Sequence, residues 1–232
     1  MNYRANIYAA KRLGVERIFA WTGPGAVSRE YRPGDLVLPD GLLDFTRSRP
    51  STFYEGKGIG FIRQHPVFCE TLRESVRAAA GRTEAAPRLH VGGTYACTEG
   101  PRLETAAEIR FLATAGADLV GMTLCPEAFL ARELEICYAP VAYVTNYAEG
   151  VRGLPYRRGD LFEGMLPPEE ASAVEAAKDA IPRIAIAAAA AVSGAARDCP
   201  CAVSMERYRK RGVIGPDFRE WVAGPGRKGR TG

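Results

Sequence analysis

The chain has 232 residues, of which 47% are apolar and 25% are charged, and its formal net charge at pH 7 is +4. This composition excludes an intrinsically disordered chain, and the length predicts one large globular domain. The sequence shows neither an apolar amino-terminal signal nor an apolar run long enough to cross a bilayer, so we expect a cytoplasmic protein without a membrane partner.

The first part of the chain alternates a helix with short apolar strands. The apolar spacing predicts a helix over residues 5–13 that stops at Gly14. A strand predicted over 17–21 leads into a glycine-rich turn over 22–25, whose free backbone N–H groups suit an anion, although an ordinary tight turn explains the same residues. The next predicted elements are short strands over 36–38 and 42–45, and a long loop over 46–66 that forms or covers a site.

The middle of the chain alternates helices with strands, a pattern typical of an α/β sheet buried on both faces. The predicted elements are a helix over 67–80, a strand over 89–96, a helix over 106–115, a strand over 119–121, a helix over 127–134 and a strand over 139–144. An alanine-rich helix opens at Pro167 and reaches Val192, and Pro182 is expected to kink it.

Polar residues follow three of these strands at the point where each strand ends. The segments are Gly93-Thr-Tyr-Ala-Cys-Thr-Glu-Gly-Pro-Arg-Leu-Glu-Thr-Ala-Ala-Glu108, Gly121-Met-Thr-Leu-Cys-Pro-Glu127 and Val141-Ala-Tyr-Val-Thr-Asn-Tyr-Ala148. Because strand ends of an open α/β sheet converge on one crevice, the sequence predicts a single binding site built from all three segments.

Together these segments resemble the purine nucleoside phosphorylase family, and within it the methylthioadenosine/methylthioinosine phosphorylase branch. The upstream residues Asn2–Ile7, Pro33–Val37, Asp44–Thr46 and Arg49-Pro50 extend the resemblance over most of residues 2–150. The resemblance implies an α/β three-layer domain with a mixed central sheet over residues 1–205, and a homotrimer. Residues 206–232 would then form a basic tail.

The implied activity is reversible phosphorolysis of a 6-oxopurine nucleoside, such as 5′-methylthioinosine, inosine or guanosine. The products are the free purine base and a (methylthio)ribose 1-phosphate, which makes the protein a pentosyltransferase of purine salvage. Phosphate is the co-substrate, and neither a metal nor an organic cofactor is implied. Such an enzyme works mainly by placement and electrostatics.

Two residues are the candidates for recognising the base. By resemblance, the Glu104 carboxylate accepts from N1–H of a 6-oxopurine; the alternative is a helix-dipole role in the first turn of helix 106–115. By resemblance, the Asn146 amide bonds N7 and O6 of the departing base, since an amide both donates and accepts. Relatives that act on 6-aminopurines carry Asp at this point, so Asn146 favours 6-oxopurines; the alternative is a turn-forming Asn at a strand end.

Five further residues match substrate positions of the family. Met122 would pack under the ribose and the Thr123 hydroxyl would touch phosphate, although both could instead be core residues. Leu103 stands where the family has an aromatic ring beside the base. Thr22 and Gly23 occupy the ribose and phosphate turn, where Pro24 removes one backbone donor.

The sequence departs from the family pattern at its beginning. Family members start with a strand and a glycine-rich phosphate loop, followed by a segment with Arg and His phosphate ligands, whereas this chain begins at Asn2-Tyr3-Arg4 in the helix expected after them. We therefore expect either a longer natural protein or a shortened relative with an impaired phosphate site. A non-catalytic purine-binding or assembly protein, and hydrolysis with water in place of phosphate, remain alternatives.

The carboxy-terminal part offers two further features. Residues 206–232 contain eight Lys and Arg against three acids, but they lack a regular interleaved aromatic pattern, so we favour a solvated terminus over a nucleic-acid partner. Cys199-Pro200-Cys201 could bind a metal or form a redox-active bridge. Because neither of the two histidines, His65 and His90, is near it in sequence, we expect no four-ligand zinc site.

Overall fold

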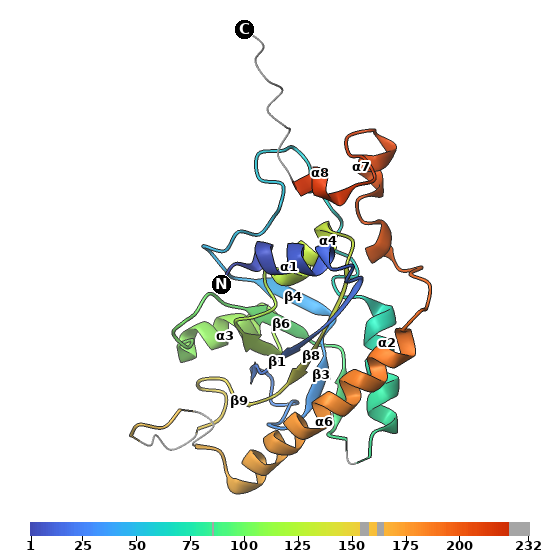
Figure 1. Ribbon diagram of the computed structural model, residues 1–232. Coiled ribbons are helices and arrows are strands. Elements are labelled where there is room, and N and C mark those ends of the chain that lie inside the picture. Colours follow the sequence, from blue (N-terminus) through green and yellow to red (C-terminus); the bar gives the residue numbers. More distant parts are fainter. Residues whose placement is uncertain (85, 154–157, 162–164, 223–232) are drawn as a thin grey trace.

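Two mixed sheets form the centre of the fold, and helices lie outside them (Figure 1). The computed structural model describes residues 1–84, 86–153, 158–161 and 165–222. The first sheet has the order β1-β8-β3-β5, with β1 Arg17–Thr22, β8 Cys137–Tyr143, β3 Leu36–Leu38 and β5 Leu89–Val91. The second has the order β4-β6-β7-β2-β9, with β4 Gly41–Asp44, β6 Thr94–Cys97, β7 Leu119–Gly121, β2 Gly25–Ala26 and β9 Asn146–Tyr147. The predicted α/β class with mixed sheet pairing is confirmed, with the strands divided between two sheets.

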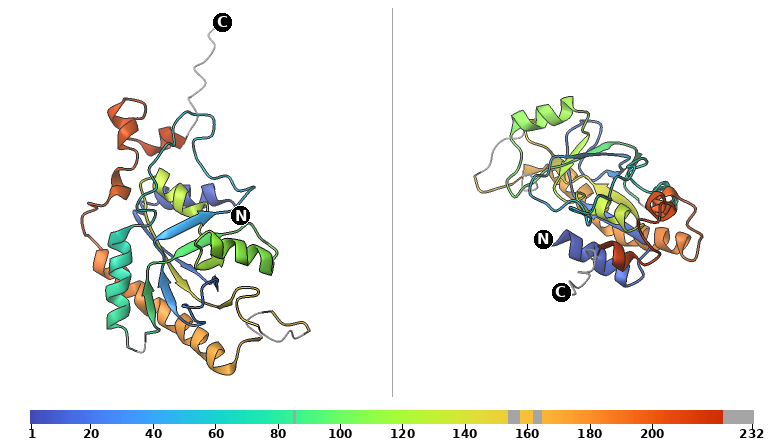
Figure 2. Two further views of the ribbon diagram at one scale, coloured as in Figure 1. Left: turned by 180° about the vertical axis from the view of Figure 1, so that it is seen from behind. Right: turned by 90° about the horizontal axis from the view of Figure 1, so that it is seen from above.

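The helices cover the sheets in two groups (Figure 2). On one side α2 (Glu70–Arg82) packs against the long α6 (Pro168–Val192), which continues through Pro182. At the other end α1 (Tyr3–Arg12) packs against α4 (Glu127–Glu133), and α3 (Ala106–Thr114) follows the loop after β6. The chain ends with η1 (Pro200–Val203), α7 (Glu206–Lys210) and α8 (Phe218–Val222).

Local sequence explains where α3 and α6 begin. Thr105 caps α3, because its hydroxyl oxygen accepts a hydrogen bond from the backbone N–H of Glu108. The Glu108 carboxylate in turn accepts from the backbone N–H of Thr105, and the two bonds form a capping box. Pro168 and two acidic residues in the first turn open α6. The buried face of α6 consists of Val174, Ala177, Ala180, Ile184, Ala188 and Val192. These small side chains allow the helix to lie close to α2 and the first sheet.

The single strand predicted over 89–96 is wrong. It divides into β5 and β6, which belong to different sheets: β5 pairs with β3, and β6 pairs with β4 and β7. Gly92 and Gly93, with φ of 106° and 123°, make the break because side-chain-bearing residues rarely adopt such angles. This break carries the chain from one sheet to the other and places the end of β6 at the candidate site.

The expectation of a solvated terminus is wrong for residues 206–222. Tyr208 and Trp221 are buried and join the main apolar core, and Arg209 forms an ion pair with Glu135 at 2.7 Å. Basic residues surround Tyr208 and Trp221 in the sequence, so the sequence pattern did not indicate that these two side chains are buried. Residues 223–232 lie outside the described residues. Within the described part of the chain, no helix has the length and apolar character needed to span a membrane.

Candidate functional site

All seven residues predicted from the sequence to touch substrate line one pocket of about 240 Å³. The pocket lies where β1 and β7 end and where β2 and β9 begin, next to the end of the loop before α3. Its lining residues are Thr22, Gly23, Gly25, Leu103, Glu104, Val120, Gly121, Met122, Thr123, Asn146, Ala148 and Glu149. The structure therefore brings the three polar segments together, while the role of each residue stays a prediction.

Glu104 lies between the pocket and the start of α3. One carboxylate oxygen accepts a hydrogen bond of 2.5 Å from the Thr98 hydroxyl, and Thr98 follows β6 directly. Glu104 precedes the N-cap residue Thr105, and the acidic residue of the first helical turn is Glu108. The helix-dipole alternative therefore describes Glu108 better than Glu104, whose second carboxylate oxygen accepts no hydrogen bond from the described residues.

Asn146 is fixed by its two neighbours in sequence. Its side-chain oxygen accepts from the Thr145 hydroxyl at 2.6 Å, and its side-chain nitrogen donates to the Tyr147 carbonyl at 2.9 Å. An amide oxygen has a second lone pair and the nitrogen has a second hydrogen. Asn146 can thus still donate one hydrogen bond and accept one from a ligand in the pocket. Gly25 pairs with it across β2 and β9, and a Cβ at Gly25 would come within 3.2 Å of the amide nitrogen.

Three hydroxyl groups meet at the inner wall of the pocket. The oxygens of Thr22 and Thr123 are 2.7 Å apart, and the Tyr95 hydroxyl lies 3.2 Å from the first and 3.3 Å from the second. Tyr95 is fully buried, and burial of its hydroxyl group away from water raises its pKa to about 12. The hydroxyl therefore stays protonated at neutral pH. The hydroxyl cluster can donate to an anion without carrying charge itself.

The sequence analysis missed Tyr95 because it lies inside a strand rather than at its end. The signal that could have revealed it is Gly121 at the end of the neighbouring strand β7. A Cβ at Gly121 would lie 2.1 Å from the Tyr95 hydroxyl oxygen, so only glycine leaves room for that oxygen. Met122, the next residue, packs against Gly100, where a Cβ would lie 2.5 Å from the Met122 sulfur. Leu103 is 44% exposed at the pocket edge.

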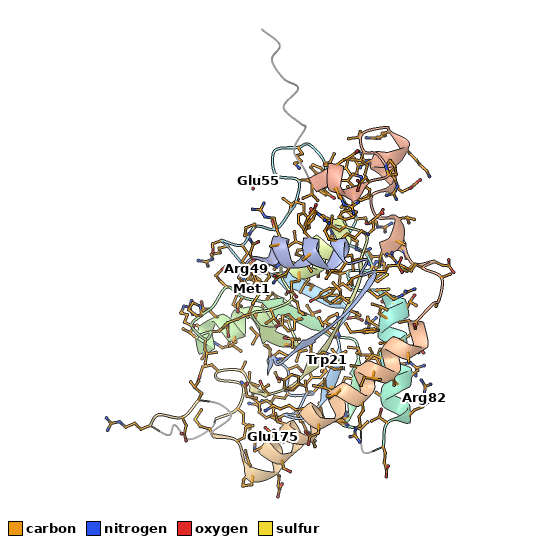
Figure 3. The ribbon with its side chains drawn as sticks, in the orientation of Figure 1. Met1, Trp21, Arg49, Glu55, Arg82 and Glu175 are labelled. Carbon is orange, nitrogen blue, oxygen red and sulfur yellow. The ribbon has the colours of Figure 1, made fainter. Side chains whose placement is uncertain are left out.

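Arg49 joins the loop after β6 to the loop after β7, and it was not among the predicted site residues. Its guanidinium donates to the carbonyls of Met122 at 2.7 Å, Cys125 at 2.6 Å, Thr98 at 3.0 Å and Glu99 at 2.8 Å. The side chain is only 8% exposed and lies 5.4 Å from the Tyr3 ring of α1, close to Met1 in Figure 3. Arg49 holds both of these loops beside the pocket without itself lining it.

The positive charges near the site lie outside the pocket itself. Among the described residues that line it, none is Lys, Arg or His. Arg47 and Arg102 line a neighbouring cavity of about 320 Å³, which shares Glu104 with the pocket. Arg102 is committed to an ion pair with Glu108 at 2.7 Å. The pocket therefore offers hydroxyl, amide and carboxylate groups but little positive charge for a phosphate.

Neither histidine lies in the pocket. The His90 ring nitrogen is 2.7 Å from an Asp35 carboxylate oxygen, and the ring packs edge-on against Tyr31 at a centroid distance of 4.8 Å. His90 is therefore structural in this chain, because its contacts tie β5 to the residue before β3. His65 is exposed in the loop before α2.

A family model described as the phosphorylase superfamily matches residues 1–195. The 6-oxopurine nucleoside phosphorylase of Pyrococcus furiosus is 49% identical over 172 residues, covering 71% of this chain and 64% of that protein. A Methanothermobacter thermautotrophicus protein named "Probable S-methyl-5′-thioinosine phosphorylase" is 47% identical over 165 residues, covering 71% of this chain and 56% of that one. This chain thus spans less than two thirds of either relative. A solved methylthioadenosine phosphorylase from an antarctic soil metagenomic library aligns with a TM-score of 0.76 and 29% identity, covering 87% of this chain and 68% of that one.

Proposed function

Since the chain belongs to the phosphorylase superfamily, we propose that it acts on 6-oxopurine nucleosides and transfers their pentose to phosphate. The observation that carries this proposal is the pocket shared by Glu104, Asn146, Thr22 and Thr123, with the buried Tyr95 hydroxyl in contact with both threonines. A carboxylate acceptor and an amide suit the edges of a 6-oxopurine, and neutral hydroxyls suit the oxygens of ribose and phosphate. The names of the two curated relatives support the same substrate class.

The proposed reaction forms one bond and breaks another at the same sugar carbon. A phosphate oxygen bonds to C1′ as the bond between C1′ and N9 of the purine breaks, and the bonding electron pair leaves with the base. Asn146 bonds N7 and O6, where negative charge accumulates, and the leaving base takes up, through solvent, the proton that the attacking hydrogen phosphate loses. Glu104 accepts from N1–H and orients the base, while Thr123 and the turn at Thr22 and Gly23 face the phosphate.

An assay of base release tests this proposal directly. Inosine, guanosine, 5′-methylthioinosine and adenosine are each incubated with the protein, with and without phosphate, and the free base is quantified by chromatography. We expect phosphate-dependent release with a kcat/KM at least about 10-fold higher for the 6-oxopurine nucleosides, because Glu104 accepts from N1–H of a 6-oxopurine, whereas N1 of adenosine carries no hydrogen to donate. A preference for adenosine, or release that does not need phosphate, would contradict the proposal.

The lack of cationic residues among the described pocket lining favours a second candidate, a protein that binds purine without turnover. Phosphate binding normally relies on charge-assisted hydrogen bonds worth about 1.5–3 kcal/mol each, and two missing bonds weaken binding by at least about 100-fold. Calorimetric binding of hypoxanthine together with undetectable turnover at saturating phosphate would select this candidate. Turnover with a high KM for phosphate would select the enzyme.

We also propose that the protein is a homotrimer that needs no cofactor. Phe111 and Leu103 are 59% and 44% exposed beside the site, and burying such apolar surface favours association. Light scattering of the purified protein measures the assembly. Activity that survives dialysis against a chelator supports the absence of a catalytic metal, and a monomer at micromolar concentration would contradict the trimer.

A further inference from the structure

Four of the six cysteines meet at one point outside the pocket. Cys69 precedes α2, Cys137 begins β8, and Cys199 and Cys201 flank Pro200 at the start of η1. Their sulfur atoms all lie within 4.8 Å of one another, and all four cysteines are free. In Figure 1 the chain leaves α6 and passes the amino-terminal end of α2 before it reaches α7. The fold thus brings the thiols of Cys69 and Cys137, which are distant in sequence, next to Cys199 and Cys201.

The spacing of the sulfurs matches a tetrahedral metal site. A zinc ion bound by four thiolates has Zn–S distances of about 2.3 Å, which place the sulfurs roughly 3.8 Å apart. The sulfurs of Cys137 and Cys199 are 3.3 Å apart and no separation in the cluster exceeds 4.8 Å, so the cluster has the dimensions of such a site. A disulfide requires about 2.05 Å between two sulfurs and needs only pairs of cysteines to be close. Mutual proximity of all four is the arrangement that a single ion requires.

The backbone around the cysteines is already fixed by hydrogen bonds. The Cys69 N–H donates to the Tyr138 carbonyl at 2.9 Å, and the Cys137 N–H donates to the Glu16 carbonyl at 2.9 Å. Cys69, Cys137 and Cys201 are buried in a small apolar core with Leu72 and Val192, and Cys199 borders it. Three of the four donors therefore lie in a dry site with little freedom to move.

Two arginines supply positive charge next to the cluster. The Arg197 guanidinium lies near Cys137 and pairs with Glu16 at 3.5 Å, and its buried Nε atom has no hydrogen-bond partner among the described atoms. Arg132 acts electrostatically on Cys201. Four thiolates around a divalent ion carry a net charge of about −2, which two neighbouring guanidinium groups can offset.

We propose that Cys69, Cys137, Cys199 and Cys201 bind one zinc ion in a closed structural site. Thiolates select soft metals, and a site with four protein ligands leaves no position open for catalysis. The ion would fasten the segment after α6 to the start of α2 and to β8. This segment includes α7 and α8, whose Tyr208 and Trp221 are buried in the main core. We expected no metal site because only the two histidines were considered as ligands beside Cys199 and Cys201; Cys69 and Cys137 supply the other two.

Metal analysis of the full chain tests the proposal. The protein is produced with zinc in the medium, purified without chelator, and its metal content is measured by mass spectrometry. We expect about one zinc per protomer. Cys199→Ser and Cys201→Ser should each weaken zinc binding by at least about 100-fold, since loss of an outer-shell partner alone costs 10- to 100-fold. Cys125→Ser removes another buried cysteine and should retain the metal.

A second measurement decides the question if a serine variant fails to fold. Wild-type protein is reduced, stripped of metal and titrated with cobalt, which should give the sulfur-to-cobalt charge-transfer absorption of a four-thiolate site with an end point of about one per protomer. Protein without metal whose four thiols all react with a thiol reagent would overturn the proposal. So would intact-mass analysis showing disulfides among the four cysteines in protein purified under reducing and oxidising conditions alike.

Discussion

Replacing Gly121 by alanine should destabilise the protein through the buried hydroxyl of Tyr95. The added Cβ would lie 2.1 Å from the Tyr95 hydroxyl oxygen and 2.9 Å from the ring carbon that bears it, both closer than real Cβ contacts. Tyr95 cannot move away easily, because it is fully buried and its hydroxyl bonds both Thr22 and Thr123. Overpacking of this kind typically costs about 1–3 kcal/mol, and we expect the upper end.

The variant Tyr95→Phe separates steric overlap from other effects of the alanine. By itself it removes the two hydroxyl contacts and should cost about 1 kcal/mol. In the double variant the closest clash is gone, so the combined loss should be smaller than the sum of the single losses by at least about 1 kcal/mol. For a chain of this size, a loss of about 3 kcal/mol lowers Tm by roughly 6–12 °C.

Denaturant and thermal unfolding of the wild type, both single variants and the double variant measure this coupling. Gly81→Ala is the matched control, because nothing lies within 4 Å of its added Cβ in α2, and it should stabilise the protein by roughly 0.5–1 kcal/mol. Additive losses in the double variant, or an unchanged stability of Gly121→Ala, would refute the reasoning. Such a result would mean that Tyr95 does not sit beneath the pocket as described.

Three further predictions concern base recognition and pH. Asn146→Asp should shift the substrate preference from 6-oxo toward 6-amino purine nucleosides, because a carboxylate repels O6; unchanged ratios of kcat/KM would contradict its assignment to the base. Glu104→Gln should lower kcat/KM for inosine by roughly 10- to 100-fold with little change in Tm, whereas Glu108→Ala, which breaks the cap of α3, should lower Tm and spare base recognition. Burial raises the pKa of Glu133 from 4.5 to about 7 despite hydrogen bonds from Phe53 and Thr52, so between these pH values the folded state retains a proton that the unfolded state has released. Stability should therefore fall by roughly 3 kcal/mol as pH rises through this window, and Glu133→Gln should remove that dependence in unfolding measurements from pH 4.5 to 8.

The elements at the site were predictable wherever apolar strands end in polar residues. The strand over 119–121 and the helix beginning at Ala106 match the prediction, and Glu104, Thr123 and Asn146 share one pocket as expected from converging strand ends. The division of β5 from β6 also had a local signal in Gly92-Gly93, which the apolar run around it outweighed. Strand ends in the sequence therefore located the loops, whereas the break between β5 and β6 depends on the backbone angles of two glycines.

The remaining features depend on contacts between residues far apart in the chain. Arg49 is 73 residues from the Met122 carbonyl it bonds, and Cys199 is 62 residues from Cys137. Local periodicity in the sequence predicts neither contact, because each contact depends on which strands pair and in which register. Tyr95 was hidden for the same reason, since a strand residue with an apolar ring reveals its polar partners only once β1 and β7 are in place.

The hydrogen bonds from Arg49 to the loops after β6 and β7 have a consequence for how the site can change during evolution. All four of its short contacts are to main-chain carbonyls, which every amino acid provides. Apart from Glu99, whose carboxylate also pairs with Arg49 at 3.5 Å, side chains in these loops can therefore be exchanged without loss of an Arg49 contact. Substitutions at Leu103 or Met122 can change the shape of the pocket during evolution, while the backbone that holds these residues is kept by the same guanidinium.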